Sequence, residues 1–162
     1  MGKEVIGWRE WVALPDLGVD LIKTKVDTGA RTSALHAFHI DPFKQKGKDW
    51  VRFAVHPIQG DDDVVRVCTS LVHDSRMVTN SGGMSERRWV IGTTIVLGDE
   101  SWAIELTLTN RDEMGFRMLI GRTAIKGRFI VDPGQSYRMK HPEGPEWDRM
   151  MVHRKSPNDE EE

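Results

Sequence analysis

The segment with the clearest chemical potential is Asp27-Thr28-Gly29-Ala30, which directly follows an apolar, strand-like run ending at Val26. A strand that runs into these residues places a carboxylate at a tight turn, where Gly29 lets backbone amides come close to it. A carboxylate held by amides and a neighbouring hydroxyl is oriented and partly excluded from water. The same residue types form ordinary strand-ending turns, so the tetrapeptide alone leaves both interpretations open.

A second segment of interest lies far along the chain, at Leu119-Ile120-Gly121-Arg122. Two bulky apolar residues followed by glycine predict a buried strand that ends in a turn. Taken alone, this segment predicts structure and no particular chemistry.

Two histidines allow a metal-based alternative. His36 and His39 are three residues apart and would share a face if their segment were helical. No His-Glu-x-x-His motif occurs, and Cys68 is the only cysteine, so a third zinc ligand would have to come from a distant segment. We therefore predict no bound metal or other cofactor, and keep a zinc-dependent hydrolase using His36, His39 and a carboxylate as the alternative.

The elements that must position these residues are mainly strands. Short runs rich in Val, Ile, Thr and Trp alternate with clusters of Gly, Pro, Asp and Asn, a pattern typical of strands and turns. Helical turns are expected at Thr32–Phe38 and Thr123–Lys126. Strands are expected at Asp20–Val26, Trp50–His56, Val64–Val72, Arg76–Thr79, Arg88–Leu97, Ser101–Thr109, Met118–Ile120 and Arg128–Val131.

Length and charge restrict the class of protein. The 162 residues suit one domain, expected over residues 1–140, with a polar, flexible tail over 141–162. With 23 basic and 25 acidic residues, the net charge of -2 argues against a nucleic-acid partner. No run resembles a signal peptide or a membrane span, so we expect a cytoplasmic protein without a membrane partner. Because no Gly-rich phosphate loop occurs, any use of ATP would belong to a partner protein.

Together, the two motifs resemble those of the retropepsin family of aspartic peptidases, in which the segments lie side by side beneath the active site. The likeness covers residues 4 to 138 and extends to a bacterial branch labelled ATP-dependent zinc proteases. It implies a mainly β, closed barrel-like domain that functions as a C2 homodimer. The matching segments are Ile6–Glu10, Leu14–Gly18, Lys25–Ala37, Thr107–Arg111 and Met118–Pro133.

The resemblance also implies roles for individual residues. Asp27 takes the position of the catalytic aspartate, Thr28 that of the hydroxyl bracing the paired loops across the dimer, and Gly29 and Ala30 complete the loop. The supporting segment corresponds to Leu119, Ile120, Gly121 and Arg122. Arg31 departs from the pattern, because viral retropepsins usually carry there an aspartate that pairs with the later arginine. Arg122 must then find another partner, or Arg31 faces the substrate.

The expected function is hydrolysis of a peptide or amide bond in a peptide or protein substrate. Such chemistry needs two carboxylates sharing one proton, and Asp27 is the only aspartate in an Asp-Thr/Ser-Gly setting, so two chains must supply the pair. The best candidate for a flap is the hairpin Arg76–Val90, with Gly82 and Gly83 at its tip to contact substrate. A non-catalytic peptide-binding module remains a further alternative.

Overall fold

The computed structural model describes residues 3–58, 63–80, 82–110 and 115–141, so the predicted tail from 142 onward lies outside the described residues. The expectation of a mainly β protein is confirmed. The elements are β1 (Glu4–Gly7), β2 (Arg9–Leu14), a 3-10 turn (Pro15–Leu17), β3 (Val19–Asp27), β4 (Ser33–His36), β5 (Phe38–Gln45), β6 (Lys48–Val55), β7 (Arg66–Thr79), β8 (Ser85–Leu97), β9 (Glu100–Thr109), β10 (Met118–Gly121), α1 (Arg122–Ile125) and β11 (Phe129–Asp132).

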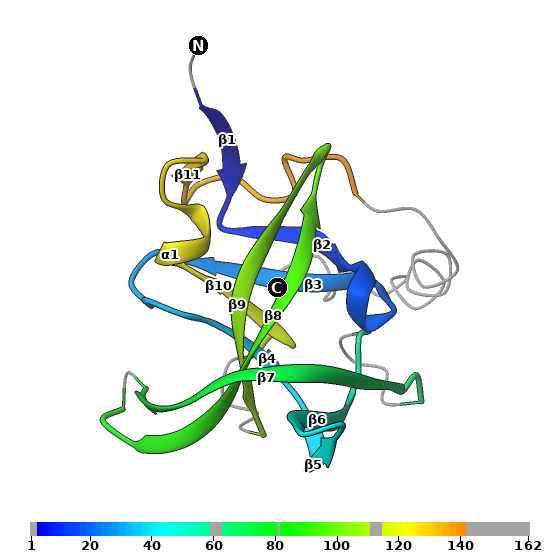
Figure 1. The fold of residues 1–162 in the computed structure, drawn as a ribbon. Helices are drawn as coiled ribbons and strands as arrows, with labels where there is room; N and C mark the ends of the chain where they lie inside the picture. The colour runs from blue at the N-terminus through cyan, green and yellow to red at the C-terminus, as the bar shows by residue number, and fades with distance from the viewer. Residues whose placement is uncertain (1–2, 59–62, 81, 111–114, 142–162) are drawn as a thin grey trace.

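Six strands close into a barrel, in the order β2-β3-β10-β4-β9-β8, and a pairing of Ala13 with Val96 joins the last strand to the first (Figure 1). Closure leaves no free strand edge in this part of the sheet. Apolar side chains fill the barrel, among them Ile22, Leu35, Leu106 and Ile120, all fully buried. The expected closed barrel is therefore confirmed.

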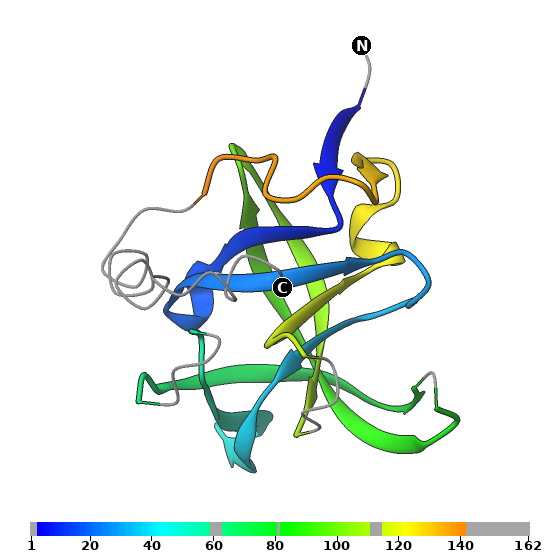
Figure 2. The ribbon, with the colours of Figure 1, turned by 180° about the vertical axis from the view of Figure 1, so that it is seen from behind.

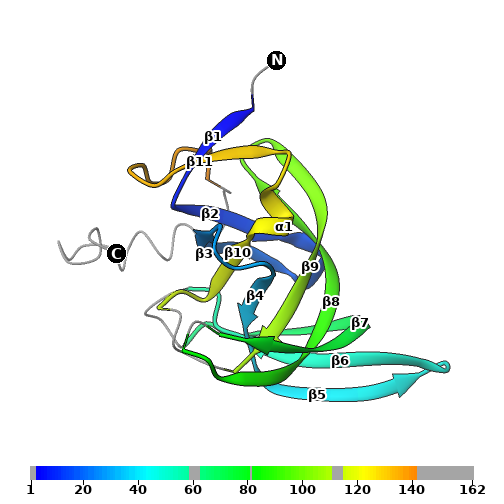
Figure 3. The same cartoon turned by 90° about the vertical axis from the view of Figure 1, so that its left-hand side faces the viewer.

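The sheet continues beyond the barrel through two long strands. β7 and β8 have 14 and 13 residues, and their far ends form the hairpin predicted as a flap. On its other edge β7 pairs with β6, and β6 pairs with β5. Figure 3 shows β5 and β6 extending away from the barrel. Of the two strands that carry the predicted flap, β8 is thus part of the barrel and β7 pairs along it.

One predicted helical turn is wrong and the other is confirmed. The segment predicted as a turn at Thr32–Phe38 contains strand β4, which lies between β10 and β9. All four β4 residues are buried, so the strand lacks the alternation of apolar and polar residues by which strands are recognised. At the second position α1 forms one short helical turn, in which the buried Trp102 indole donates a hydrogen bond to the Ala124 carbonyl, 3.1 Å away.

The strand β7 is continuous where the sequence predicts two strands. Its register shifts between Val72 and Asp74, which marks a β-bulge. The bulged His73 packs onto Gly92 of β8, where an added Cβ would lie 2.2 Å from the imidazole. Glycine at this position lets the two strands stay paired across the bulge.

Candidate functional site

Asp27 is the last residue of β3 and begins a tight turn. The Gly29 amide donates a hydrogen bond to Asp27 Oδ1, 3.0 Å away, and the Ala30 amide donates to the Asp27 carbonyl at 3.2 Å. A Cβ on Gly29 would lie 3.2 Å from Oδ1, tighter than ordinary van der Waals contact. The turn therefore orients the carboxylate as expected, with glycine allowing the close approach.

Strand β10 lies next to this turn and supports it. It runs parallel to β3, with Gly121 opposite Asp27, and in Figure 2 it crosses between β3 and β4. A Cβ on Gly121 would lie 2.5 Å from the Thr32 carbonyl carbon, and the Gly121 amide donates to Ser33 Oγ at 3.0 Å. The two sequence motifs therefore lie side by side, as their resemblance to retropepsins implies.

The start of α1 holds the chain that follows the turn. The Arg122 amide donates to the Ala30 carbonyl at 2.7 Å. The Arg31 carbonyl accepts two hydrogen bonds from Thr123, from its amide at 3.2 Å and its hydroxyl at 2.9 Å. The backbone that follows Gly29 is thus held in place by residues 92 positions later in the chain.

Arg122 lacks the aspartate partner usual in viral retropepsins and is bonded to a backbone carbonyl instead. Its Nη1 donates to the Thr28 carbonyl at 3.2 Å, so the arginine braces the catalytic-type turn without an aspartate. Thr28 and Arg122 also line a second pocket of about 660 Å³, with Phe129 and Val131 in its wall. The role of the Thr28 hydroxyl between two subunits remains a prediction.

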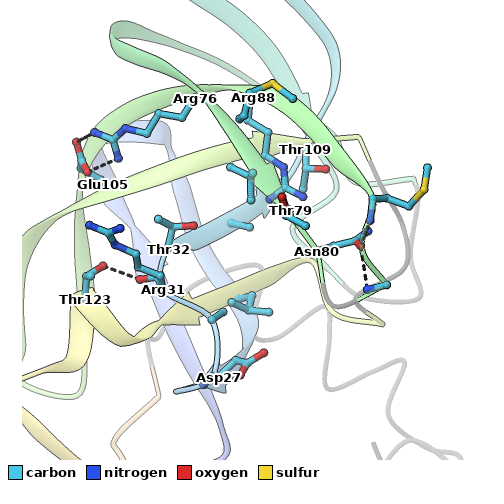
Figure 4. A pocket seen from close by; sticks show the side chains of 18 of the residues that line it. Asp27, Arg31, Thr32, Arg76, Thr79, Asn80, Arg88, Glu105, Thr109 and Thr123 are labelled. Atoms are coloured by element: carbon cyan, nitrogen blue, oxygen red, sulfur yellow. Dashed lines mark hydrogen bonds and ion pairs between the residues drawn. The ribbon is translucent and has the colours of Figure 1, made fainter.

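A cavity of about 1300 Å³ separates the turn from the predicted flap, as Figure 4 shows. Asp27, Ala30, Arg31 and Leu119 lie along one side of it. The other side is formed mainly by the hairpin residues Met77, Val78, Thr79, Asn80, Gly82 and Met84. The structure thus places the Asp27 turn and the predicted flap on opposite sides of one cavity.

The hairpin turn is organised by Asn80. Its Oδ1 accepts hydrogen bonds from the amides of Gly82 and Met84, each at 3.0 Å. Gly83 has a φ of 83°, which favours glycine, and its amide donates to the Asn80 carbonyl at 3.0 Å. Of the two glycines predicted to contact substrate, Gly82 lines the cavity and Gly83 shapes the turn.

Four basic and two acidic side chains line the cavity, and of these the sequence analysis named only Asp27 and Arg31 as site residues. Arg76 forms a two-point ion pair with Glu105, at 2.9 and 3.0 Å, and a further one with Asp74 at 2.7 Å. Hydrogen bonds from Arg76 hold the pKa values of both carboxyls below their usual range. Because these residues lie on separate strands, no local sequence pattern identifies the cluster.

Arg88 is the second cavity arginine engaged by a carboxylate. Its Nε donates to Glu86 Oε1 at 2.6 Å, and the same oxygen accepts from the Thr109 hydroxyl at 2.6 Å. Only 9% of the Arg88 side chain is exposed, so burial also restricts the movement of this side chain. This arginine is therefore part of the packing between β8 and β9.

In the part of the chain that the structure describes, His36, His39 and Cys68 do not form a second centre. His36 is buried at the end of β4, whereas His39 is exposed on β5. Within the described ranges, no three His, Cys, Asp or Glu side chains are placed to hold a metal ion together. Cys68 is buried as expected, and burial raises the pKa of its thiol to about 11, which keeps it protonated near neutral pH.

The family model described as "RimB-like: Retropepsin-like aspartic endopeptidase RimB" matches residues 5–142. The chain belongs to the RimB-like family. This assignment agrees with the retropepsin likeness of the two motifs and with the barrel that brings them together. Among solved structures, this RimB-like chain is similar to a Legionella pneumophila protein of unknown function, with a TM-score of 0.70 and 27% identity, covering 86% of this chain and all of the other.

Curated relatives carry a different name. The chain is 51% identical over 135 residues to a Shewanella pealeana protein and 52% identical over 137 residues to a Parasynechococcus marenigrum protein, each named "Probable alpha-L-glutamate ligase". These matches cover 83% and 85% of this RimB-like chain but only 30% and 29% of the relatives' lengths. The name therefore describes proteins of which this chain matches about a third.

Within the described residues, no helix is long and apolar enough to cross a membrane.

Proposed function

We propose that this RimB-like chain is an aspartic peptidase whose active site is completed by a second copy. The observation that carries the proposal is the Asp27 carboxylate, held by the Gly29 amide at 3.0 Å and placed on a cavity beneath a hairpin. A two-fold axis next to Asp27 would bring it to its own copy, as any residue near such an axis meets its equivalent.

The proposed reaction depends on two Asp27 carboxyl groups at close range. They share one proton, because two negative charges so close together would repel each other. One carboxylate takes a proton from a water molecule as the water oxygen attacks the peptide carbonyl carbon. The other donates its proton to the carbonyl oxygen. When the tetrahedral intermediate collapses, the C–N bond breaks, the amine leaves with a proton from the dyad, and a hydroxyl of the intermediate returns a proton to the other carboxylate.

Peptides rich in glutamate are the substrates that the cavity and the relatives favour. Four basic side chains line the cavity, namely Lys25, Arg31, Arg76 and Arg88. Relatives that contain a matching segment are named glutamate ligases, so a hydrolase acting on glutamyl peptide bonds would reverse the bond formation that their name describes. Ligation of an amino acid needs an energy source, so such a ligase is the ATP-using partner that we propose for this chain.

Subunit mixing tests the shared site directly. We expect Asp27→Asn to abolish cleavage of oligoglutamate peptides across acid to neutral pH. In refolded mixtures, activity should follow the square of the wild-type fraction, so an equal mixture retains about one quarter of the activity instead of one half. Peptide cleavage by mass spectrometry and subunit mass by analytical ultracentrifugation measure both effects.

The alternatives give different results in the same experiment. Cleavage that survives Asp27→Asn and is lost with a chelator would support the zinc-dependent hydrolase. Binding without cleavage by either protein would support the peptide-binding module. A linear dependence on the wild-type fraction would contradict a shared pair of aspartates.

A further inference from the structure

We propose that Arg31, assisted by Lys25, is the specificity-determining residue that binds a side-chain carboxylate of the substrate. The inference rests on the proposed function, because it assigns a receptor for the acidic substrate to one side of Asp27. It also divides the four cavity cations into two pairs with separate tasks.

Arg76 and Arg88 are committed to the protein. Arg76 bonds Glu105 and Asp74, and Arg88 bonds Glu86, all at 3.0 Å or less. All three guanidinium nitrogens of Arg76 already donate to carboxylates. The Arg88 side chain is only 9% exposed and also donates from Nη1 to the Thr107 hydroxyl at 3.5 Å. These two arginines therefore organise the hairpin and strands and do not select the substrate.

Arg31 and Lys25 are uncommitted. Among the described residues, neither side-chain cation has a hydrogen-bond or ion-pair partner, although both line the cavity that holds Asp27. In Figure 4 no dashed line reaches the Arg31 guanidinium, whereas its backbone carbonyl is bonded to Thr123. The structure thus fixes the backbone of Arg31 and leaves its charged end available.

The positions of both cations relative to Asp27 suit this task. Lys25 lies two residues before Asp27 on β3, so its side chain leaves the same face of the strand. Arg31 follows the turn and borders both the main cavity and the second pocket beside α1. A substrate carboxylate next to the scissile bond would meet a planar guanidinium able to form two parallel hydrogen bonds, with an ammonium nearby.

Binding in a non-cleaving background isolates this role from catalysis. The parent protein is Asp27→Asn, and the probes are a fluorescein-labelled oligoglutamate and a matched oligoglutamine, measured by fluorescence anisotropy at low and physiological salt. We expect the parent to prefer oligoglutamate, and Arg31→Met to reduce that preference by about tenfold. Arg31→Lys should restore part of it, because charge is kept and the two-point geometry is lost.

Two further variants make the test specific. Arg52→Met removes an exposed arginine on β6, away from the cavity, and should leave the preference unchanged. Arg31→Glu should reverse the preference in favour of an oligolysine probe. Equal unfolding midpoints for all variants would show that the exposed Arg31 side chain does not act through folding.

The outcomes separate this inference from the proposed function. Unchanged oligoglutamate binding in Arg31→Met, or no preference in the parent, overturns the assignment of Arg31 even if Asp27-dependent cleavage is found. Loss of the preference together with Asp27-independent cleavage retains Arg31 as the receptor and overturns the aspartic mechanism. In the cleaving protein, Arg31→Met should raise KM for glutamate peptides far more than KM for matched glutamine peptides.

Discussion

Gly29 lies within the Asp27 turn and Gly121 lies beside it on β10, and the two glycines have different neighbours. A Cβ on Gly121 would overlap the Thr32 backbone, at 2.5 Å from the carbonyl carbon. A Cβ on Gly29 would meet only Asp27 Oδ1, at 3.2 Å. Backbone atoms cannot move aside as a side chain can. Gly121 is therefore needed for the packing of the barrel, and Gly29 for the position of the Asp27 carboxylate.

Alanine at each glycine separates these roles. Gly121→Ala should lower the free energy of unfolding by about 2–3 kcal/mol, because overpacking pushes β10 away from the turn. Gly29→Ala should leave stability within about 0.5 kcal/mol and reduce peptide cleavage, because only the carboxylate is displaced. Urea unfolding and cleavage rates measure the pair, and equal loss of stability in both variants would contradict the distinction.

The hairpin formed by β7 and β8 is anchored at its base by Arg76. This arginine joins β7 to Glu105 of β9 through two hydrogen bonds, and also bonds Asp74 on its own strand. Both carboxylates are about half exposed, so the ion pairs contribute little to global stability. Their expected effect is local, on how far the hairpin swings over the cavity.

Local opening of the hairpin should respond to Glu105→Gln and to strong acid. Arg76 lowers the pKa values of Glu105 and Asp74, so their contribution is present above the ordinary carboxyl pKa and is lost as pH falls through the lowered values. Hydrogen exchange over residues 76–90 should therefore rise in Glu105→Gln at neutral pH, but in the wild type only below about pH 4.

A surface ion pair elsewhere provides the control for this prediction. Lys44 and Asp49 face each other at 3.9 Å on the β5–β6 hairpin, with both side chains largely exposed. Asp49→Asn should leave exchange over residues 76–90 unchanged. Equal exchange in Glu105→Gln and the wild type would show that the Arg76 anchor does not restrain the hairpin.

At the scale of the whole molecule, Glu10 joins the two ends of the described chain. Its fully buried carboxylate accepts hydrogen bonds from the amides of Gly7 at 2.7 Å, Arg138 at 2.9 Å and Met139 at 3.1 Å. Nearby, β1 and β11 pair in parallel outside the barrel, at the top of Figure 1. One side chain thus satisfies three backbone donors from segments far apart in sequence.

Removal of this carboxylate should destabilise the whole fold. Glu10→Ala leaves three backbone N–H groups without their acceptors and should lower the free energy of unfolding by about 3 kcal/mol or more. Glu10→Gln keeps one acceptor oxygen and should cost less. Glu100→Ala, at the exposed first residue of β9, should change stability by less than about 0.5 kcal/mol. Denaturant unfolding measures all three, and equal values for Glu10→Ala and Glu100→Ala would contradict the role.

Local patterns were sufficient for most strands and for the two motifs, but β1, β2, β4 and β5 were not predicted. At β4 and β5, burial or exposure removed the alternation. β4 is buried on both faces, between two barrel strands, and was mistaken for a helical turn. β5 was missed because it is a mostly exposed edge strand with charged residues and Pro42. In both cases the neighbours of the strand, which are distant in sequence, determine its structure.

By itself the sequence determined the strand-rich class, the Asp27 turn, the later segment that supports it and the position of the hairpin predicted as a flap. Only the tertiary structure decided which charges are available: Arg76 and Arg88 are engaged by carboxylates, whereas Arg31 and Lys25 are not. It also decided that Arg122 bonds a Thr28 carbonyl instead of an aspartate. The physical reason is range, because strand periodicity and turns depend on neighbouring residues, whereas an ion pair or a hydrogen bond needs two groups within about 3 Å in space.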